Sequence, residues 1–138
     1  EPGPPAALEI DGMPPLLELQ PGPLLEELTT INKVSQNLAS ELLLRRLGLF
    51  RGEGSAAKGI EAIRTMLERA GVDPGAVTLA DGSGMSTYNR VTPRATVGLL
   101  RWAASRPWGA DYRRTLPVGG VDGTLARRFK EGPLHGRV

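Results

Sequence analysis

The 138-residue chain contains no cysteine, so neither a disulfide framework nor a thiolate metal site can form. Aromatic residues make up only 4% of the chain, and its core must therefore be built from Leu, Ala, Val and Ile. No apolar run reaches the roughly 18 residues that a membrane span needs. With one histidine and no visible carboxylate cluster, the sequence predicts no metal site and no cofactor, and His135 is expected on the surface near the C-terminal end.

Basic residues are absent from the first 32 positions, which contain six acids. The whole chain has 17 Lys and Arg against 15 Asp and Glu, a net charge of +2. The Arg residues are scattered rather than clustered. This pattern favours an acidic segment lying against a basic body and argues against a nucleic-acid partner.

Proline and glycine divide the chain into short elements, with 12 Pro and 18 Gly in all. Residues 1–15 are predicted to form a Pro/Gly-rich extended tail, and residues 16–138 a single domain. Leu16–Leu19 fits a short strand or a turn of helix. The chain opens on Glu1 without a basic-then-apolar leader, so a mature or excised piece is expected.

Apolar spacing and capping residues predict a mainly α fold with one or two very short strands. Val77–Ala80 is the clearest strand candidate, and Gly119-Gly120 is expected to be a flexible joint. The expected helices run from Pro23 to near Thr30, from about Asn37 to Leu47 with Gly48 as the stop, from a Ser55 cap through Ala70, over 93–105 after a Thr92 cap, over 108–116, and from an Asp122 or Thr124 cap to about Lys130.

The triplet Ser35-Gln36-Asn37 stands where a leucine-rich helix is expected to begin. A serine hydroxyl can accept and donate a proton, and an Asn amide can grip a peptide backbone. At a bend before a helix, positions i and i+2 can both face one cleft. The alternative is structural, because Ser and Asn are both favoured N-cap residues and the side chains would then only cap the helix.

The segment Asp81-Gly-Ser-Gly-Met-Ser86 is a glycine-rich loop whose backbone can approach a ligand closely. The alternative is a tight structural turn in which Asp81 binds the amides of its own loop. A phosphate-binding loop is excluded, because no Gly-Lys-Ser/Thr follows.

Together, Asn32-Lys-Val-Ser-Gln-Asn37, the loop 81–86 and Leu116-Pro-Val-Gly-Gly-Val-Asp-Gly-Thr-Leu125 resemble, in order, the D-alanyl-D-alanine carboxypeptidase/endopeptidase family of penicillin-binding serine peptidases (the DacB-like, peptidase S13 type). The resemblance implies that Ser35 passes a proton to the departing amine and that Asn37 binds the peptide. It implies that Met85 and Ser86 lie near the substrate. Relatives commonly carry Arg where this chain has Thr87, which leaves the side-chain preference open.

The resemblance also implies a fold in which helices pack on an antiparallel sheet, the α/β serine β-lactamase/penicillin-binding transpeptidase-like fold. Two family motifs are missing, the Ser-x-x-Lys nucleophile and the Lys-Thr-Gly strand. Ser55-Ala-Ala-Lys58 spells the first, but it follows the Ser-x-Asn motif instead of preceding it, and a helix cap explains Ser55. The role of Lys33 is left open.

Residues 16–138 are accordingly interpreted as a partial peptidase domain, part of an exported, periplasmic or extracytoplasmic enzyme that acts through an acyl-serine. Its partners would be peptidoglycan stem peptides and β-lactams, and the isolated chain is expected to be inactive. Two other classes remain. The chain could be a non-catalytic helical module that binds a peptide or protein, or, with less support, a helical nucleic-acid binder.

Overall fold

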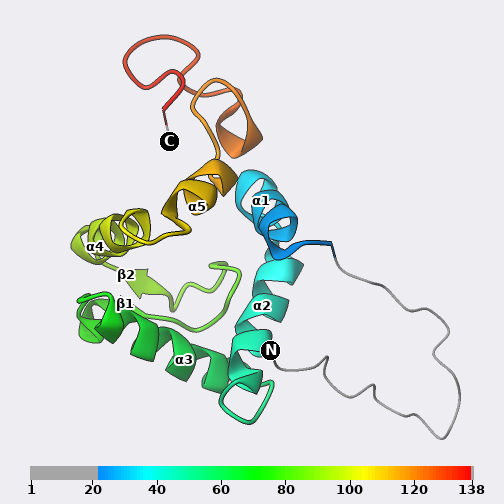
Figure 1. Ribbon diagram of the computed structural model, residues 1–138, viewed down its shortest axis with the longest axis vertical. Coiled ribbons are helices and arrows are strands. Elements are labelled where there is room, and N and C mark those ends of the chain that lie inside the picture. The colour runs from blue at the N-terminus through cyan, green and yellow to red at the C-terminus, as the bar shows by residue number, and fades with distance from the viewer. Residues whose placement is uncertain (1–21, 138) are drawn as a thin grey trace, which may run out of the picture.

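The computed structural model describes residues 22–137, which are mainly helical (Figure 1). This confirms the predicted fold class. Among these residues, no helix is long and apolar enough to cross a membrane. The elements in order are α1 (Leu24–Val34), α2 (Asn37–Leu49), α3 (Ala56–Arg69), the 3₁₀ turn η1 (Pro74–Ala76), β1 (Val77–Thr78), β2 (Arg90–Val91), α4 (Pro93–Ala104), α5 (Gly109–Thr115) and the 3₁₀ turn η2 (Gly123–Leu125).

The helices pack in pairs. α2 packs against α3, α1 packs on α5, and α4 also meets α5. β1 and β2 pair antiparallel, with Val77 opposite Val91, beside α3 and α4 (Figure 1). The apolar core lies here, with Leu67, Val72 and Ala95 at its centre.

Both helices that border this core begin as the sequence predicts. The Ser55 hydroxyl accepts the Lys58 amide at 3.3 Å and caps α3. The Thr92 hydroxyl accepts the Ala95 amide at 3.2 Å and caps α4, whose first residue is Pro93. Each cap satisfies a helix amide that would otherwise have no partner.

Two helix ends were predicted wrongly. α1 continues past Thr30 to Val34, and α2 continues through Gly48 to Leu49. Gly48 is buried in the helix rather than ending it. A Cβ there would stand 2.6 Å from the Ser55 carbonyl oxygen, so this glycine permits close packing against the start of α3.

The C-terminal prediction was also wrong, because only the short turn η2 forms where a helix was expected to reach Lys130. Asp122 does not cap it, since its carboxylate binds Lys33 and the Val118 amide. Gly119-Gly120 is not a free joint either. The Gly119 amide donates to the Arg137 carbonyl, and the Gly120 amide donates to Leu125. His135 is exposed, as expected, with a ring nitrogen 3.3 Å from the Phe129 carbonyl oxygen. The predicted tail over residues 1–15 and the element at Leu16–Leu19 lie outside the described residues.

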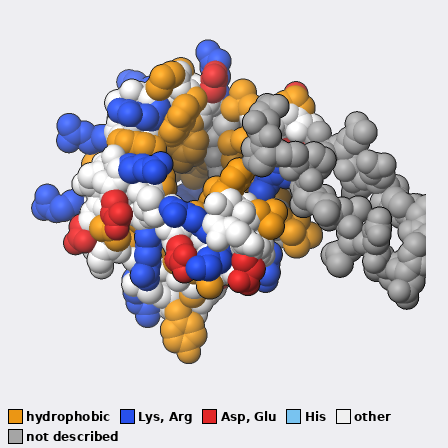
Figure 2. Space-filling view, turned by 60° about the horizontal axis from the view of Figure 1, so that its bottom comes forward, with side chains coloured by type: hydrophobic (Ala, Val, Ile, Leu, Met, Phe, Trp, Pro, Cys, Tyr) orange, Lys and Arg blue, Asp and Glu red, His pale blue; other side chains and the backbone are white. Residues whose placement is uncertain are grey.

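Many large apolar side chains are exposed within the described part of the chain, including Leu38 (66%), Met85 (71%) and Tyr88 (76%). Figure 2 shows several orange patches on one face of the molecule. Residues 22–137 thus bury a modest core and leave apolar surface around it.

The crossing of α2 and α3 gives a testable prediction at Gly59. A Cβ there would lie 2.1 Å from the Leu44 carbonyl oxygen, a backbone atom that cannot rotate away. Gly59→Ala should therefore destabilise the chain by about 1–3 kcal/mol, although Ala is favoured in helices by about 1 kcal/mol. Urea denaturation measures this. The exposed Glu61→Ala on the same helix is the control and should shift stability by less than about 0.5 kcal/mol; an equal effect of both changes would contradict the steric argument.

Candidate functional site

The Ser-x-Asn turn joins α1 to α2 through a left-handed residue. Ser35 has φ 59° and ψ 56°, and the Gln36 amide donates to the Ile31 carbonyl at 3.1 Å. This is the Schellman arrangement for ending a helix, and glycine normally occupies the left-handed position. A side chain there costs roughly 1–2 kcal/mol. Ser35 is therefore held in a conformation that its own residue type disfavours.

The side chains of Ser35 and Asn37 do not cap α2. Gln36 does so, because its side-chain oxygen accepts the Ala39 amide at 3.0 Å. Ser35 and Asn37 are both exposed, and neither side chain makes a hydrogen bond to residues 22–137. The capping alternative is thus wrong for this pair, and both polar groups are available to a ligand.

The two residues before the turn hold α1 against the C-terminal half. The side-chain amide of Asn32 donates to the Thr115 hydroxyl at 2.7 Å, and Thr115 is fully buried. The Lys33 ammonium binds the Asp122 carboxylate at 2.6 Å and donates to the Leu116 carbonyl at 3.0 Å. The hydrogen bond from Lys33, with that of the Val118 amide, lowers the pKa of Asp122. The contacts of Lys33 are therefore structural.

Glu41 connects α2 to the glycine-rich loop. Its carboxylate accepts the Gly82 amide at 2.9 Å and the Ser83 amide at 3.1 Å. Asn37 and Glu41 are four residues apart, which places them on one face of the helix about 6 Å apart along its axis. Two of the segments singled out in the sequence thus meet on one face of α2.

The loop itself is organised by Asp81 and Asn89. The Asp81 carboxylate accepts the Gly84 amide at 2.7 Å and the Ser86 amide at 2.6 Å. The Asn89 side chain donates to Asp81 at 2.8 Å, and its oxygen accepts the Ala80 amide at 2.8 Å. The predicted Asp81 turn is present.

Met85 and Ser86 lie at the tip of this loop. Met85 is 71% exposed, and the half-buried Ser86 accepts the Tyr88 amide through its hydroxyl at 3.2 Å. Thr87 is exposed, and its carbonyl oxygen accepts a hydrogen bond from the Arg90 guanidinium. The tip therefore presents one flexible apolar side chain beside two hydroxyls.

Ser55 and Lys58 are accounted for without catalysis. The Ser55 hydroxyl caps α3, and the Lys58 ammonium lies 3.0 Å from both carboxylate oxygens of Glu61. A serine engaged by a helix amide, and a lysine held by an exposed carboxylate, are not a nucleophile and its base.

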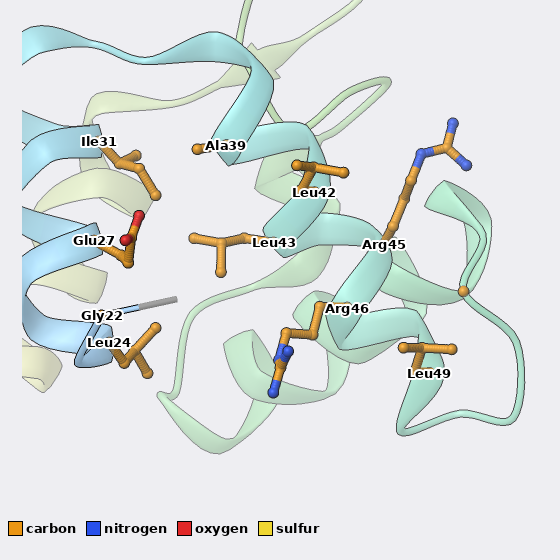
Figure 3. A pocket seen from close by; sticks show the side chains of 11 residues that line it. Gly22, Leu24, Glu27, Ile31, Ala39, Leu42, Leu43, Arg45, Arg46 and Leu49 are labelled. Atoms are coloured by element: carbon orange, nitrogen blue, oxygen red, sulfur yellow. The ribbon is translucent and has the colours of Figure 1, made fainter. Parts of the chain in front are cut away.

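A separate apolar groove of about 750 Å³ runs between α1 and α2. Leu43 points from α2 toward Glu27 and Ile31 of α1, while Arg45 and Arg46 flank the groove (Figure 3). Ser35, Asn37, Met85 and Ser86 do not line it. The groove is therefore distinct from the Ser-x-Asn site.

Comparison with known proteins places this geometry in a family. The model of the D-Ala-D-Ala carboxypeptidase 3 (S13) family matches residues 7–138. The chain belongs to this family. The family resemblance inferred from the three motifs is confirmed.

Curated relatives include a D-alanyl-D-alanine carboxypeptidase of an Actinomadura species, 36% identical over 121 residues. The alignment covers 83% of this chain and 22% of that protein. The D-alanyl-D-alanine carboxypeptidase DacB of Haemophilus influenzae is 32% identical over 108 residues, covering 77% of this chain and 22% of its own length. The chain thus spans about a fifth of the length of these relatives.

A solved structure of penicillin binding protein 4 (dacB) from Haemophilus influenzae, complexed with a β-lactam, matches with a TM-score of 0.75 at 30% identity. The match covers 83% of this chain and 27% of that one. A second structure of the same Haemophilus protein matches with a TM-score of 0.76. The helices described here therefore form part of a penicillin-binding fold, as expected.

Two residues that shape the site were missed in the sequence. Glu41 lies inside a leucine-rich helix and looks like an ordinary solvated acid, and its partners are more than 40 positions away. Asn89 lies eight positions after Asp81, and this spacing alone does not mark its role.

The lowered pKa of Asp81 gives a prediction of how the loop responds to pH. The Asn89 side chain is the main cause that lowers the pKa of Asp81 below 3.8; the Ser86 and Gly84 amides add to it, and desolvation partly opposes it. A lowered carboxyl pKa stabilises the native loop above 3.8, and this stabilisation is lost as the pH falls through the native pKa. NMR titration should find the native pKa below 3.8. The protection of the Gly84 and Ser86 amides against exchange, relative to the intrinsic rate at each pH, should fall when the pH is below that pKa.

The matched variant is Asp81→Asn, which keeps one acceptor oxygen but cannot titrate. Its amide exchange in the loop should lose the acid-dependent step. A step that survives in this variant would assign the pH dependence to another group.

The left-handed turn predicts a gain in stability from an unusual substitution. Ser35→Gly should raise the free energy of unfolding by about 1 kcal/mol, because glycine adopts positive φ without steric cost. Ser35→Ala removes the same hydroxyl but keeps a Cβ, so it should not stabilise. Thermal or urea unfolding of the two variants checks this, and equal stability of both would show that Ser35 is not strained.

Proposed function

We propose that this chain supplies one wall of the active site of a serine-type D-Ala-D-Ala carboxypeptidase/endopeptidase. The observation that carries the proposal is the state of Ser35 and Asn37. Both side chains are exposed, and Gln36 caps the helix in their place. A disfavoured backbone conformation kept at a polar, accessible residue is typical of functional sites. The loop tip at Met85 and Ser86 is the second contact surface.

The chemistry follows from the donors present. The Ser35 hydroxyl can receive a proton on one lone pair and release its own to a departing amine. The Asn37 amide can donate to a substrate carbonyl and accept from a substrate amide. The serine that forms the acyl intermediate, its lysine base and the Lys-Thr-Gly segment would come from polypeptide outside this sequence.

The substrates would be peptidoglycan stem peptides, with β-lactams as inhibitors, in an exported, periplasmic or extracytoplasmic enzyme. The names of the carboxypeptidase relatives and the β-lactam complex of the Haemophilus protein support this substrate class. Because the chain spans about a fifth of such relatives, the isolated chain should be inactive. The apolar surface around its small core fits a segment that packs against further protein.

A second candidate is a non-catalytic helical module that binds a peptide or protein. The groove between α1 and α2 favours it, because its lining is mostly apolar and Arg45 and Arg46 flank it. This candidate would use the groove and leave Ser35 and Asn37 without a role. Substitution of those two residues therefore separates the two functions.

A fluorescent penicillin tests the proposal. The isolated 138-residue chain should remain unlabelled. The longer protein, in which the chain is continuous with Ser-x-x-Lys and Lys-Thr-Gly segments, should form a covalent adduct. In that protein Ser35→Ala should slow acylation by about 100-fold or more. Asn37→Ala should slow it about tenfold through the lost hydrogen bonds.

The control in the same experiment is Ser55→Ala, which removes a serine that only caps a helix. It should lower stability by about 1 kcal/mol and leave the acylation rate unchanged. Covalent labelling of the isolated chain would contradict the proposal. Wild-type acylation rates in both the Ser35 and Asn37 variants would also contradict it.

A further inference from the structure

We infer that Glu41 is a positioning residue that fixes the glycine-rich loop, and with it Met85 and Ser86, in register with Asn37. The inference rests on the proposed function, because the two parts that Glu41 would align, Asn37 and the loop tip, belong to the proposed active site. Glu41 itself lies outside the family motifs. Glu41 would act through backbone atoms and would not touch the substrate.

The geometry of the contact supports this role. One carboxylate oxygen of Glu41 accepts two successive loop amides, Gly82 at 2.9 Å and Ser83 at 3.1 Å. Two donors on one acceptor fix both the distance and the direction of the loop backbone relative to the helix, which a single contact does not do. Hydrogen bonds to a charged acceptor are also stronger than neutral ones.

Gly82 also packs closely against α2 beside the Glu41 contact. A Cβ on Gly82 would lie 2.7 Å from the Ser40 carbonyl oxygen and 2.9 Å from the Leu44 Cβ. The loop therefore rests directly on the backbone of α2, and only glycine permits that approach. Glu41 thus binds the loop at this close approach to the helix that begins with Asn37.

The remaining side-chain hydrogen bonds of the loop are internal. Asp81 and Asn89 bind loop amides and each other, so they set the shape of the loop but not its position against α2. In residues 22–137, Glu41 supplies the side-chain hydrogen bonds from α2 to this loop. Loss of its carboxylate should thus leave a folded loop that moves relative to Asn37.

The test measures acylation by fluorescent penicillin and amide exchange at Gly82 and Ser83 in the longer protein. Glu41→Ala should speed exchange of both amides and slow acylation by about 10-fold to 100-fold, the range expected when reacting groups are misplaced by about 1 Å. Glu41→Gln keeps an acceptor oxygen and should restore most of the rate. Glu61→Ala, which removes an exposed carboxylate from α3, should change neither quantity.

A second variant tests the position of the loop without removing the Glu41 carboxylate. Gly82→Ala displaces the loop without altering the carboxylate and should also slow acylation. Faster exchange in Glu41→Ala with an unchanged acylation rate would overturn the inference, as would Glu41→Gln being as slow as Glu41→Ala. Ser35→Ala distinguishes failure of the inference about Glu41 from failure of the proposed function. If it slows acylation while Glu41→Ala does not, only the role of Glu41 fails; if Ser35→Ala has no effect, the proposed function itself fails.

Discussion

The arrangement of the site depends on the left-handed turn at Ser35. Asn32 and Lys33, just before the turn, bind the C-terminal half. Glu41, about one helical turn after the start of α2 at Asn37, binds the glycine-rich loop. The turn therefore lies between these two sets of contacts. A residue with positive φ is needed because the backbone must leave α1 and enter α2 within two residues. The Ser-x-Asn triplet that carries the proposed function therefore also contains the turn between the two helices.

Polar contacts add to apolar packing around the turn, where Ile31 of α1 and Leu44 of α2 are buried. The main core lies at α3, the hairpin and α4, away from the Ser-x-Asn turn. Three sets of polar contacts surround the turn. Lys33 forms an ion pair with Asp122, and the Asn32 side-chain amide donates to the buried Thr115 hydroxyl. The Glu41 carboxylate accepts two backbone amides of the loop. Side chains of Lys33 and Asp122 retain 21% and 37% exposure, so water weakens the pair without removing it. Directional contacts of this kind fix position more closely than they add stability.

The sequence predicted those elements whose signals are local. Ser55 and Thr92 begin helices because a hydroxyl can accept an amide three residues ahead, and both caps are present. The order of three motifs was enough to predict the family. What failed depends on distant partners: Gly48 remains helical because α3 packs on it, and the expected helix after Asp122 does not form where Lys33 occupies the capping carboxylate. The pairing of β2 with β1 spans two residues, too short for any alternation to mark it.

Glu41, Asp81 and Asn89 all bind backbone amides of the loop or of the residue beside it. Because the loop is held through its backbone, the side chains that point from its tip contribute little to its shape. Met85 and Thr87 are exposed, and neither side chain makes a hydrogen bond with the described part of the chain. A change of side chain at Met85 or Thr87 should therefore alter the charge or size of the loop tip while the loop backbone stays in place.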